Sequence, residues 1–461
     1  MKKLFSIALL LISLASFSQD ITGQWLGSID VQGTKLNLVF NINKMGNTYT
    51  ATMDSPDQKV QGIPINTVSF QNPALRMTIE VAGIEYNGTL NASNGITGSF
   101  SQGGATYPLN LNKGEAVKRK PQEPTVFNYY VENVTFQNKQ DAISLGGTLT
   151  LPSKEGKFPV VVLISGSGAQ NRDSELLGHK PFLLIADYLT KKGIGVLRFD
   201  DRGVGESKGD RNIATTKDFA TDVSAAVEYL KTRKEVNTKK IGLIGHSEGG
   251  IIAPMVAANS KDISYIVLLA GTGIPGDALL MQQTYLVGKA AGMSEDELKE
   301  AQTANEKIYN IVKTEKNLEE AKKQLTVLIQ ASFDELPADQ KPSQDEIDTV
   351  IAQQTGMIAS PWFQYFVTYD PSLILKNVKC PVLVLNGEKD VQVPSKVNTE
   401  AIKNALEKGG NKRVTVVEFP NTNHLFQECI TCSVDEYEKL EQTFSPIALK
   451  QISDWIAVQV K

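Results

Sequence analysis

The chain has 461 residues, of which 41% are hydrophobic and 21% are charged. This length allows two or three domains, and the composition is that of an ordinary globular protein. The formal net charge of −4 argues against a nucleic-acid-binding protein, which would present a basic face.

Residues 1–18 predict a signal peptide. In "MKKLFSIALLLISLASFSQD" two lysines precede an apolar run, and small serines follow at positions compatible with cleavage. We expect a mature chain that begins at Gln19 and is exported to the periplasm or the outside of the cell. The apolar run is too short to span a bilayer, and no later segment is long enough, so we expect no stable membrane anchor.

Residues 19–112 predict a small antiparallel β domain. Segments such as "KLNLVFNI" and "LRMTIEVAG" alternate apolar and polar residues, and turn sequences such as "NASNG" separate them. The domain is expected to be a small barrel or sandwich. Its opening "GQW" resembles the start of lipocalin-like barrels, or is simply a buried Trp on a first strand. Residues 113–125, "KGEAVKRKPQEPT", have the composition of a linker.

Residues 126–461 predict an α/β domain. Near-continuous apolar segments such as "PVVVLISGSG" and "CPVLVLNGEKD" alternate with amphipathic helical segments such as "PFLLIADYLTKKG". This alternation predicts a mostly parallel central sheet with helices on both faces. Sites in such sheets form at the carboxyl ends of the strands.

A helical insertion interrupts this alternation at about residues 275–373. Capping-box signals occur at Ser294–Glu297 and Ser343–Glu346. The strands on either side of the insertion end at the carboxyl edge of the sheet. A cap over the site is therefore favoured over a decorative insertion.

The pattern G-x-S-x-G occurs twice, at Gly205–Gly209 and Gly245–Gly249. A nucleophilic serine in this pattern needs a strand, a sharp turn and a helix, because the turn exposes the hydroxyl. Ser247 has "KIGLIG" before it and "GGIIAPMVAA" after it, whereas Ser207 follows the loop "DDRGVGE". We therefore predict Ser247 as the nucleophile and Ser207 as a loop residue.

A serine hydroxyl needs a base, and the chain has three histidines. His246 is adjacent to Ser247, so its ring should point elsewhere, and His179 lies early, after a Gly-rich turn. His424 follows the strand "RVTVVEFP" at its carboxyl end. By elimination and placement we predict His424 as the base.

An acid must hold the imidazole in the right tautomer. Asp390 ends the segment "VLVLNGEKD", and Glu388 is the competing candidate two residues earlier. Asp390 is preferred because it lies further into the turn. The resulting order of Ser, Asp and His along the chain is the one expected for an α/β-hydrolase.

The oxyanion needs two N–H donors. The backbone N–H of Glu248 is one, and the segment "SGSG", Ser165–Gly168, should supply the other. Ser167 is preferred, with Gly168 as the neighbouring possibility. No Lys-Ser/Thr follows at the spacing of a phosphate-binding loop. We expect neither a metal nor an organic cofactor.

Residues 126–461 resemble the α/β-hydrolase superfamily in the segments "GHSEGG", "DDRGVGES", "GEKDVQVP" and "NTNHLFQ". More narrowly, they resemble exported bacterial serine esterases related to the EstD-like esterases and to the serine-aminopeptidase-like group. The resemblance implies a catalytic triad and two oxyanion donors at these positions: Ser247, Asp390, His424, Ser167 and Glu248. Many relatives have His where Ser165 stands here, and the front β domain is outside the general pattern.

The expected substrate is a small-molecule carboxylic ester with a small or medium acyl chain. The alternatives are a peptidase acting on short peptides, an acyltransferase with the same triad, and a polymer-binding protein whose hydrolase domain is silent. The cluster "PWFQYF", Pro361–Phe366, either lines an acyl pocket or forms the core of the cap. Nothing in the sequence specifies an oligomeric state.

Cys429 and Cys432 form a C-x-x-C, and Cys380 stands alone. A second ligand pair is missing, which argues against a metal site. In an exported protein the pair is expected either to form a disulfide that staples a loop or to remain as two free thiols.

Overall fold

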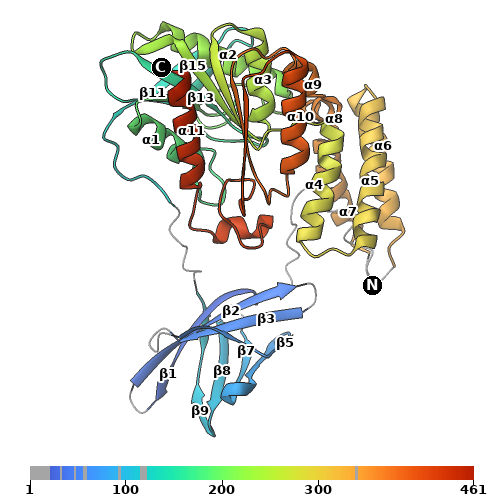
Figure 1. Cartoon of the computed structure of the whole chain (residues 1–461). Coiled ribbons are helices and arrows are strands. Elements are labelled where there is room, and N and C mark those ends of the chain that lie inside the picture. Colours follow the sequence, from blue (N-terminus) through green and yellow to red (C-terminus); the bar gives the residue numbers. More distant parts are fainter. Residues whose placement is uncertain are drawn as a thin grey trace. The chain divides into compact units, whose positions relative to one another are not determined.

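The computed structural model describes residues 21–31, 34–45, 48–55, 60–91, 95–114, 122–337 and 341–461 (Figure 1). The chain divides into two compact units between residues 119 and 120. The expected signal peptide and residues 115–121 of the expected linker lie outside the described residues. Of the remaining linker, Lys113 ends a strand, and the backbone N–H of Gln122 donates to the carbonyl oxygen of Glu441 in the second unit.

The first unit is an antiparallel sheet. Its strands are β1 (Gly23–Val31), β2 (Thr34–Met45), β3 (Thr48–Ser55), β4 (Val60–Pro64), β5 (Thr67–Gln71), β6 (Ala74–Ile79), β7 (Ile84–Leu90), β8 (Gly95–Gln102), β9 (Ala105–Pro108) and β10 (Leu111–Lys113). They follow the order β4-β3-β2-β1-β10-β8-β7-β6-β5, with β9 paired to β8. A short 3₁₀ turn, Glu80–Ala82, lies between β6 and β7.

The sheet curls so that its two ends meet. The N–H of Ile65 donates to Ala51 of β3, and the N–H of Asn66 donates to Thr78 of β6. Alternating residues point inward, and the rings of Trp25, Phe40, Tyr86 and Phe100 are buried there. Large side chains therefore fill the interior, as the alternation predicted.

The second unit contains an eight-stranded sheet in the order β11-β12-β14-β13-β15-β16-β17-β18. The strands are β11 (Tyr130–Asn138), β12 (Ile143–Leu151), β13 (Phe158–Ile164), β14 (Gly195–Phe199), β15 (Val236–His246), β16 (Ile263–Leu269), β17 (Val382–Gly387) and β18 (Val414–Phe419). The β11–β12 and β12–β14 pairs are antiparallel, and all other pairs are parallel. The mostly parallel sheet of the prediction is confirmed.

Helices cover both faces of this sheet, as Figure 1 shows. They are α1 (Pro181–Lys191), α2 (Thr216–Thr232), α3 (Gly249–Asn259), α10 (Ser395–Lys408) and α11 (Pro446–Gln459). Along β13, Val160 and Val162 pack with α2 and α3, whereas Val161 and Leu163 pack with α1 and α11. Both faces of the central strands are apolar because each contributes to a separate core.

The predicted insertion is a set of helices between β16 and β17. It comprises α4 (Gly276–Ala290), α5 (Glu295–Thr314), α6 (Leu318–Asp334), α7 (Gln344–Ile358), α8 (Pro361–Thr368) and α9 (Ser372–Leu375). The capping boxes at Ser294–Glu297 and Ser343–Glu346 begin α5 and α7. None of the described helices combines the length and the apolar character needed to cross a membrane.

Candidate active site

Ser247 lies in a sharp turn between β15 and α3. Its φ is 54°, a left-handed conformation that is strained for a residue with a side chain. The turn is tight: a Cβ on Gly245 would lie 1.9 Å from the carbonyl oxygen of Gly249, and one on Gly249 would lie 2.3 Å from that of Ile164. Only glycine fits at both motif positions, so the sequence forms a strand–turn–helix elbow around this serine.

Ser207, in the competing motif, is buried in the loop after β14. Its hydroxyl donates to the carbonyl oxygen of Asp200 (2.6 Å) and accepts from the N–H of Gly146 (3.0 Å). The first bond closes the loop on its own start after β14, and the second ties the loop to β12. Ser207 therefore has the structural position that the sequence predicted.

His424 and Asp390 lie side by side at the carboxyl end of the sheet. Nδ1 of His424 is 2.7 Å from Oδ2 of Asp390, and both side chains are buried. The other carboxylate oxygen, Oδ1, accepts from the N–H groups of Gln392 and Val393, each at 2.8 Å. These bonds fix the carboxylate, which accepts Nδ1–H and leaves Nε2 as the basic nitrogen of the imidazole.

His246 connects this pair to the elbow. Its ring centroid lies 4.8 Å from that of His424, and its Nε2 lies 3.0 Å from the His424 carbonyl oxygen. Burial and the neighbouring His424 lower the pKa of His246 to about 3. The neutral ring therefore donates Nε2–H to that carbonyl oxygen and holds the His424 loop against the last residue of β15, which precedes Ser247.

The other candidate base, His179, and the other candidate acid, Glu388, make hydrogen bonds elsewhere. His179 is buried, with Nδ1 3.0 Å from the Thr443 hydroxyl and Nε2 3.1 Å from the Tyr437 carbonyl oxygen. Glu388 accepts from the N–H of Asn421 at 3.1 Å, a bond that lowers the pKa of its exposed carboxyl. Neither side chain shows a hydrogen bond to the His424–Asp390 pair within the described part of the chain.

The loop after β13 passes close to Ser247. A Cβ on Gly166 would lie 3.1 Å from the Cβ of Ser247, a tighter approach than most Cβ contacts, so a side chain here would crowd Ser247. Ser167 and Gly168 line the same cavity as Ser247 and Glu248. Among the described hydrogen bonds, the N–H groups of Ser167 and Glu248 have no acceptor within the chain. They are available for an oxyanion.

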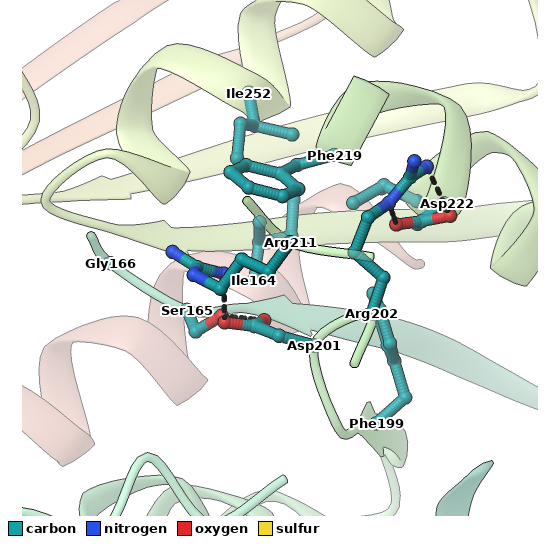
Figure 2. A pocket seen from close by; sticks show the side chains of 11 residues that line it. Ile164, Ser165, Gly166, Phe199, Asp201, Arg202, Arg211, Phe219, Asp222 and Ile252 are labelled. Carbon is teal, nitrogen blue, oxygen red and sulfur yellow. Dashed lines mark hydrogen bonds and ion pairs between the residues drawn. The ribbon is translucent and has the colours of Figure 1, made fainter. Parts of the chain in front are cut away.

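An acid that the sequence did not single out anchors this loop. Asp201 accepts from the Ser165 hydroxyl (2.6 Å), the Gln170 N–H (3.1 Å) and Nη1 of Arg211 (3.1 Å). Figure 2 shows its carboxylate between Ser165 and Arg211. Burial nevertheless raises the pKa of Asp201 to about 6. The only sequence signal was the second Asp of "DDRG", directly after a strand.

A cavity of about 730 Å³ opens beside Ser247 under the cap. The cap contributes Leu279 and Leu280 from α4, Met357 from α7 and Trp362 and Phe366 from α8. The helical insertion therefore covers the cavity beside Ser247, as the sequence predicted from the ends of the flanking strands. The "PWFQYF" cluster serves both expected roles, because its residues line the cavity and pack within the cap.

The side chain of Glu248 joins the elbow to the cap. Its Oε1 accepts from the Thr216 hydroxyl (2.7 Å) and from Nε1–H of Trp362 (2.8 Å). Its Oε2 is buried and has no hydrogen-bond partner, and burial raises the pKa of this carboxyl. The sequence identified only the backbone N–H of this residue, since the partners come from distant segments.

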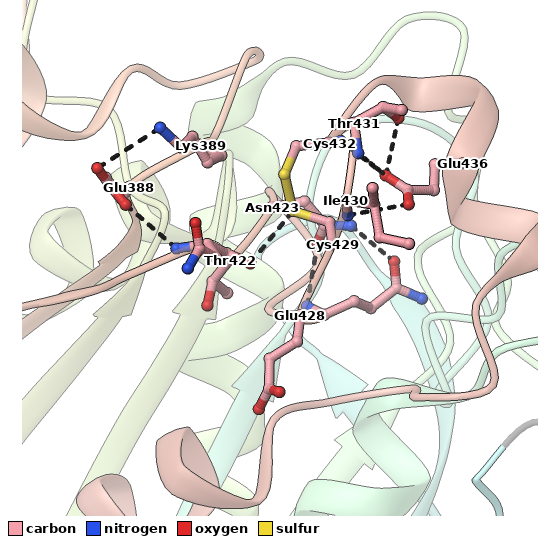
Figure 3. The surroundings of a disulfide bond; sticks show 12 residues. Glu388, Lys389, Thr422, Asn423, Glu428, Cys429, Ile430, Thr431, Cys432 and Glu436 are labelled. Atoms are coloured by element: carbon pink, nitrogen blue, oxygen red, sulfur yellow. Dashed lines mark hydrogen bonds and ion pairs between the residues drawn. A yellow bond between two sulfur atoms is a disulfide. The ribbon is translucent and has the colours of Figure 1, made fainter.

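Cys429 and Cys432 form a disulfide, which decides between the two expectations for this pair (Figure 3). The Glu436 carboxylate accepts from the N–H groups of Ile430, Thr431 and Cys432 at 2.6 to 3.0 Å. This loop precedes a 3₁₀ helix, Val434–Lys439, whose first residue lines the cavity. The disulfide is therefore part of the scaffold around the site.

Two family models match parts of the second unit. "Serine aminopeptidase, S33" matches residues 180–294, and "BAAT / Acyl-CoA thioester hydrolase C terminal" matches residues 325–430. Together with the sheet order and the elbow, these matches show that the second unit has an α/β-hydrolase fold. The chain differs from the general pattern by its additional N-terminal antiparallel domain.

Individual proteins also resemble parts of the chain. Esterase EstD of Thermotoga maritima is 28% identical over 299 residues, which are 64% of this chain and 61% of the relative. The uncharacterized protein PA2218 of Pseudomonas aeruginosa is 32% identical over 174 residues, 37% of this chain and 44% of the relative. The crystal structure of PA2218 superposes with a TM-score of 0.46 and 19% identity, covering 75% of this chain and 98% of that chain. The sequence matches thus span less than two thirds of the length of both curated relatives.

Proposed function

We propose that this protein is a serine esterase that hydrolyses carboxylic esters through an acyl-enzyme intermediate. The observation that carries this proposal is the 2.7 Å contact between His424 Nδ1 and Asp390 Oδ2, beside the elbow that holds Ser247. The similarity of residues 180–294 and 325–430 to hydrolase families supports it.

The three residues have distinct roles in the proposed reaction. Nε2 of His424 takes the proton of the Ser247 hydroxyl as the serine oxygen attacks the acyl carbon. Asp390 stabilises the imidazolium that forms. His424 then protonates the leaving alcohol, and a water activated by the same imidazole releases the acyl group from Ser247.

The developing negative charge needs fixed donors. The N–H groups of Glu248 and Ser167 are proposed to bind the oxyanion, with Gly168 as the alternative second donor. The N-terminus of α3 also favours negative charge at this position. Because these donors belong to the backbone, they need little reorganisation during the reaction.

The cavity supports an acyl chain of small or medium length. Its cap side is lined by Leu, Met, Trp and Phe side chains, which suit an apolar acyl group. The described lining residues include one acid, Glu248, and its carboxyl is engaged with Thr216 and Trp362. Its other oxygen, Oε2, is buried. A substrate ammonium, as an aminopeptidase requires, would therefore find no exposed carboxylate oxygen among the described lining residues.

Peptidase activity is the second candidate, because one matching family model describes serine aminopeptidases. Turnover of p-nitrophenyl acetate and butyrate should be compared with turnover of aminoacyl-p-nitroanilides. We expect the esters to react at least about tenfold faster in kcat/KM. Anilide turnover above ester turnover would make the peptidase the better assignment.

Labelling identifies the nucleophile. A fluorophosphonate should add one phosphonyl group to Ser247, located by peptide mass spectrometry. Ser247→Ala should abolish both labelling and ester turnover, a loss of about 10³-fold or more. Ser207→Ala is the matched control, since it makes the same change in the other motif. Labelling that persists in Ser247→Ala and disappears in Ser207→Ala would overturn the assignment.

Export is a separate proposal. The disulfide between Cys429 and Cys432 supports it, because such bonds persist in oxidising compartments. Fractionation of cells expressing the full chain should find the protein, cleaved before Gln19, in the periplasm or medium. Recovery of the uncleaved chain in the cytoplasm would contradict the proposal.

A further inference from the structure

The cavity has a cation at one side. Arg211, in the loop before α2, lines it, and the other charged side chain among the described lining residues is Glu248. The Arg211 side chain is 21% exposed, so it is held by the protein and still reaches the cavity. Arg211 lines the same cavity as the proposed nucleophile and pairs with Asp201, so the question is what its remaining donors bind.

The contacts of Arg211 leave most of its donors free. Nη1 donates to Asp201 at 3.1 Å, and the guanidinium carbon lies 4.7 Å from the Phe219 ring centroid. Figure 2 shows the guanidinium between that carboxylate and that ring. Of its five N–H groups, only this one donates a hydrogen bond among the contacts described for the chain.

Asn212, the next residue, also has unused hydrogen-bond donors. The Asn212 side chain is exposed and lines the cavity, and its amide group makes no described hydrogen bond. A guanidinium and a carboxamide, adjacent in sequence, thus present unused donors to one cavity. This donor set suits a carboxylate, which accepts several hydrogen bonds at once.

The nearby acids do not occupy these donors. Asp201 shares its two oxygens among Ser165, Gln170 and Arg211. Oε1 of Glu248 is bound to the cap and to α2, and its Oε2 is shielded from the cavity by burial. A ligand carboxylate would therefore meet the guanidinium without displacing a protein acid.

We propose that Arg211, together with Asn212, binds a carboxylate carried by the substrate, so that the preferred esters are anionic. This inference rests on the proposed esterase function and names its substrate class. The carboxylate is on the acyl part, as in monoesters of dicarboxylic acids, or on the alcohol part.

Matched ester pairs test the proposal. On the acyl side, the mono-p-nitrophenyl ester of glutaric acid is compared with p-nitrophenyl valerate, which has the same chain length and no charge. On the alcohol side, 4-acetoxybenzoate is compared with 4-methylphenyl acetate. We expect the wild type to prefer the anionic member of at least one pair by about tenfold or more in kcat/KM, the range of a charge-assisted hydrogen bond.

Substitutions assign the preference to the residue. Arg211→Gln should reduce the anionic-to-neutral ratio by about tenfold, and Arg211→Lys should reduce it less, because an ammonium keeps the charge without the planar fork. Arg413→Gln is the matched control, since Arg413 is exposed and lies at the amino end of β18. It should leave the ratio unchanged. A ratio that is the same in wild type and Arg211→Gln, with both esters slowed equally, would assign Arg211 a structural role only.

Measuring ester binding without turnover tests the role of Arg211 independently of the proposed esterase activity. In Ser247→Ala the intact esters can be titrated by calorimetry, and the anionic ester should bind about tenfold tighter only when Arg211 is present. If the wild type turns over no ester, the esterase proposal fails, and the titration still decides the role of Arg211. Equal binding of both esters with and without Arg211 would overturn the inference.

Discussion

Trp362 in the cap donates a hydrogen bond of 2.8 Å to the carboxyl of Glu248, the residue that follows the elbow serine. The acceptor is buried, and its other partner, Thr216, comes from α2. One carboxyl oxygen thus receives donors from the cap and from the core of the hydrolase domain. This contact therefore ties α8 to the elbow, while within α8 the ring of Trp362 stacks on that of Phe366, with centroids 5.4 Å apart.

Trp362→Phe should loosen the cap. The change keeps an aromatic ring but removes the donor, which leaves a buried acceptor with one partner and costs about 1 kcal/mol of unfolding free energy. We also expect kcat/KM to fall more for p-nitrophenyl octanoate than for the acetate, because the longer chain uses more of the cap wall. Urea unfolding and a series of acyl lengths measure both effects.

Trp455→Phe is the control for this change. Trp455 lies on α11 and donates to the Thr415 hydroxyl at 3.3 Å. It should lose some stability but keep the wild-type dependence on acyl length. An acyl-length profile that is unchanged in Trp362→Phe would contradict the proposed role of the contact.

His246→Phe should slow the reaction step while leaving substrate binding nearly unchanged. The variant loses the Nε2–H that donates to the His424 carbonyl oxygen, so the base is less well placed. We expect kcat to fall about tenfold or more, in line with a misplaced general base. KM should change by less than about threefold.

The pH profile distinguishes this positioning role from a second base. Because the pKa of His246 is lowered to about 3, the ring stays neutral through the working range. The pH dependence of kcat should therefore keep its shape in His246→Phe. His246→Gln, whose amide can also donate, should recover part of the rate. Loss of one limb of the profile in His246→Phe would show that His246 itself titrates in the reaction.

Asp201 makes stability depend on pH. Burial raises its pKa from the ordinary 3.8 to about 6, so between these values the folded protein binds more protons than the unfolded chain. The contribution is fully present below about pH 4 and is lost as pH rises through about 6. It amounts to about 3 kcal/mol from the shift in pKa.

Asp201→Asn should remove this dependence. The unfolding free energy of the wild type, minus that of the variant, should decrease from pH 4 to pH 7 in urea titrations. Asp454→Asn, an exposed position on α11, is the matched substitution and should leave the dependence as it is. A difference between wild type and Asp201→Asn that is constant or increases with pH would contradict the raised pKa.

The sequence predicted the positions that follow from strand ends. Ser247, Asp390 and His424 each follow one of the parallel strands of the sheet, and the carboxyl ends of such strands meet at one edge. The contact between Trp362 and Glu248 could not be predicted in this way. These residues are 114 positions apart and meet only because the cap folds back over the elbow.

Two other features were also beyond sequence patterns. The pairing of β11 and β12 with the rest of the sheet is antiparallel, and the segments "VENVTFQN" and "ISLGGTLTL" carry no signal for that direction. The link from Asp201 to Ser165 depends on how two loops pack, not on local propensity. The catalytic roles of the residues in the site stay predictions until the substitutions are measured.

The chain enters the cap after β16 and returns to the sheet at β17, and these two strands are neighbours in the sheet. The first and last residues of the cap are therefore close together. The segments that hold the proposed nucleophile, base and acid all lie outside the cap. A different insertion could replace the cap at these two points while the proposed catalytic residues keep their positions. Substrate selectivity can thus evolve separately from the catalytic residues.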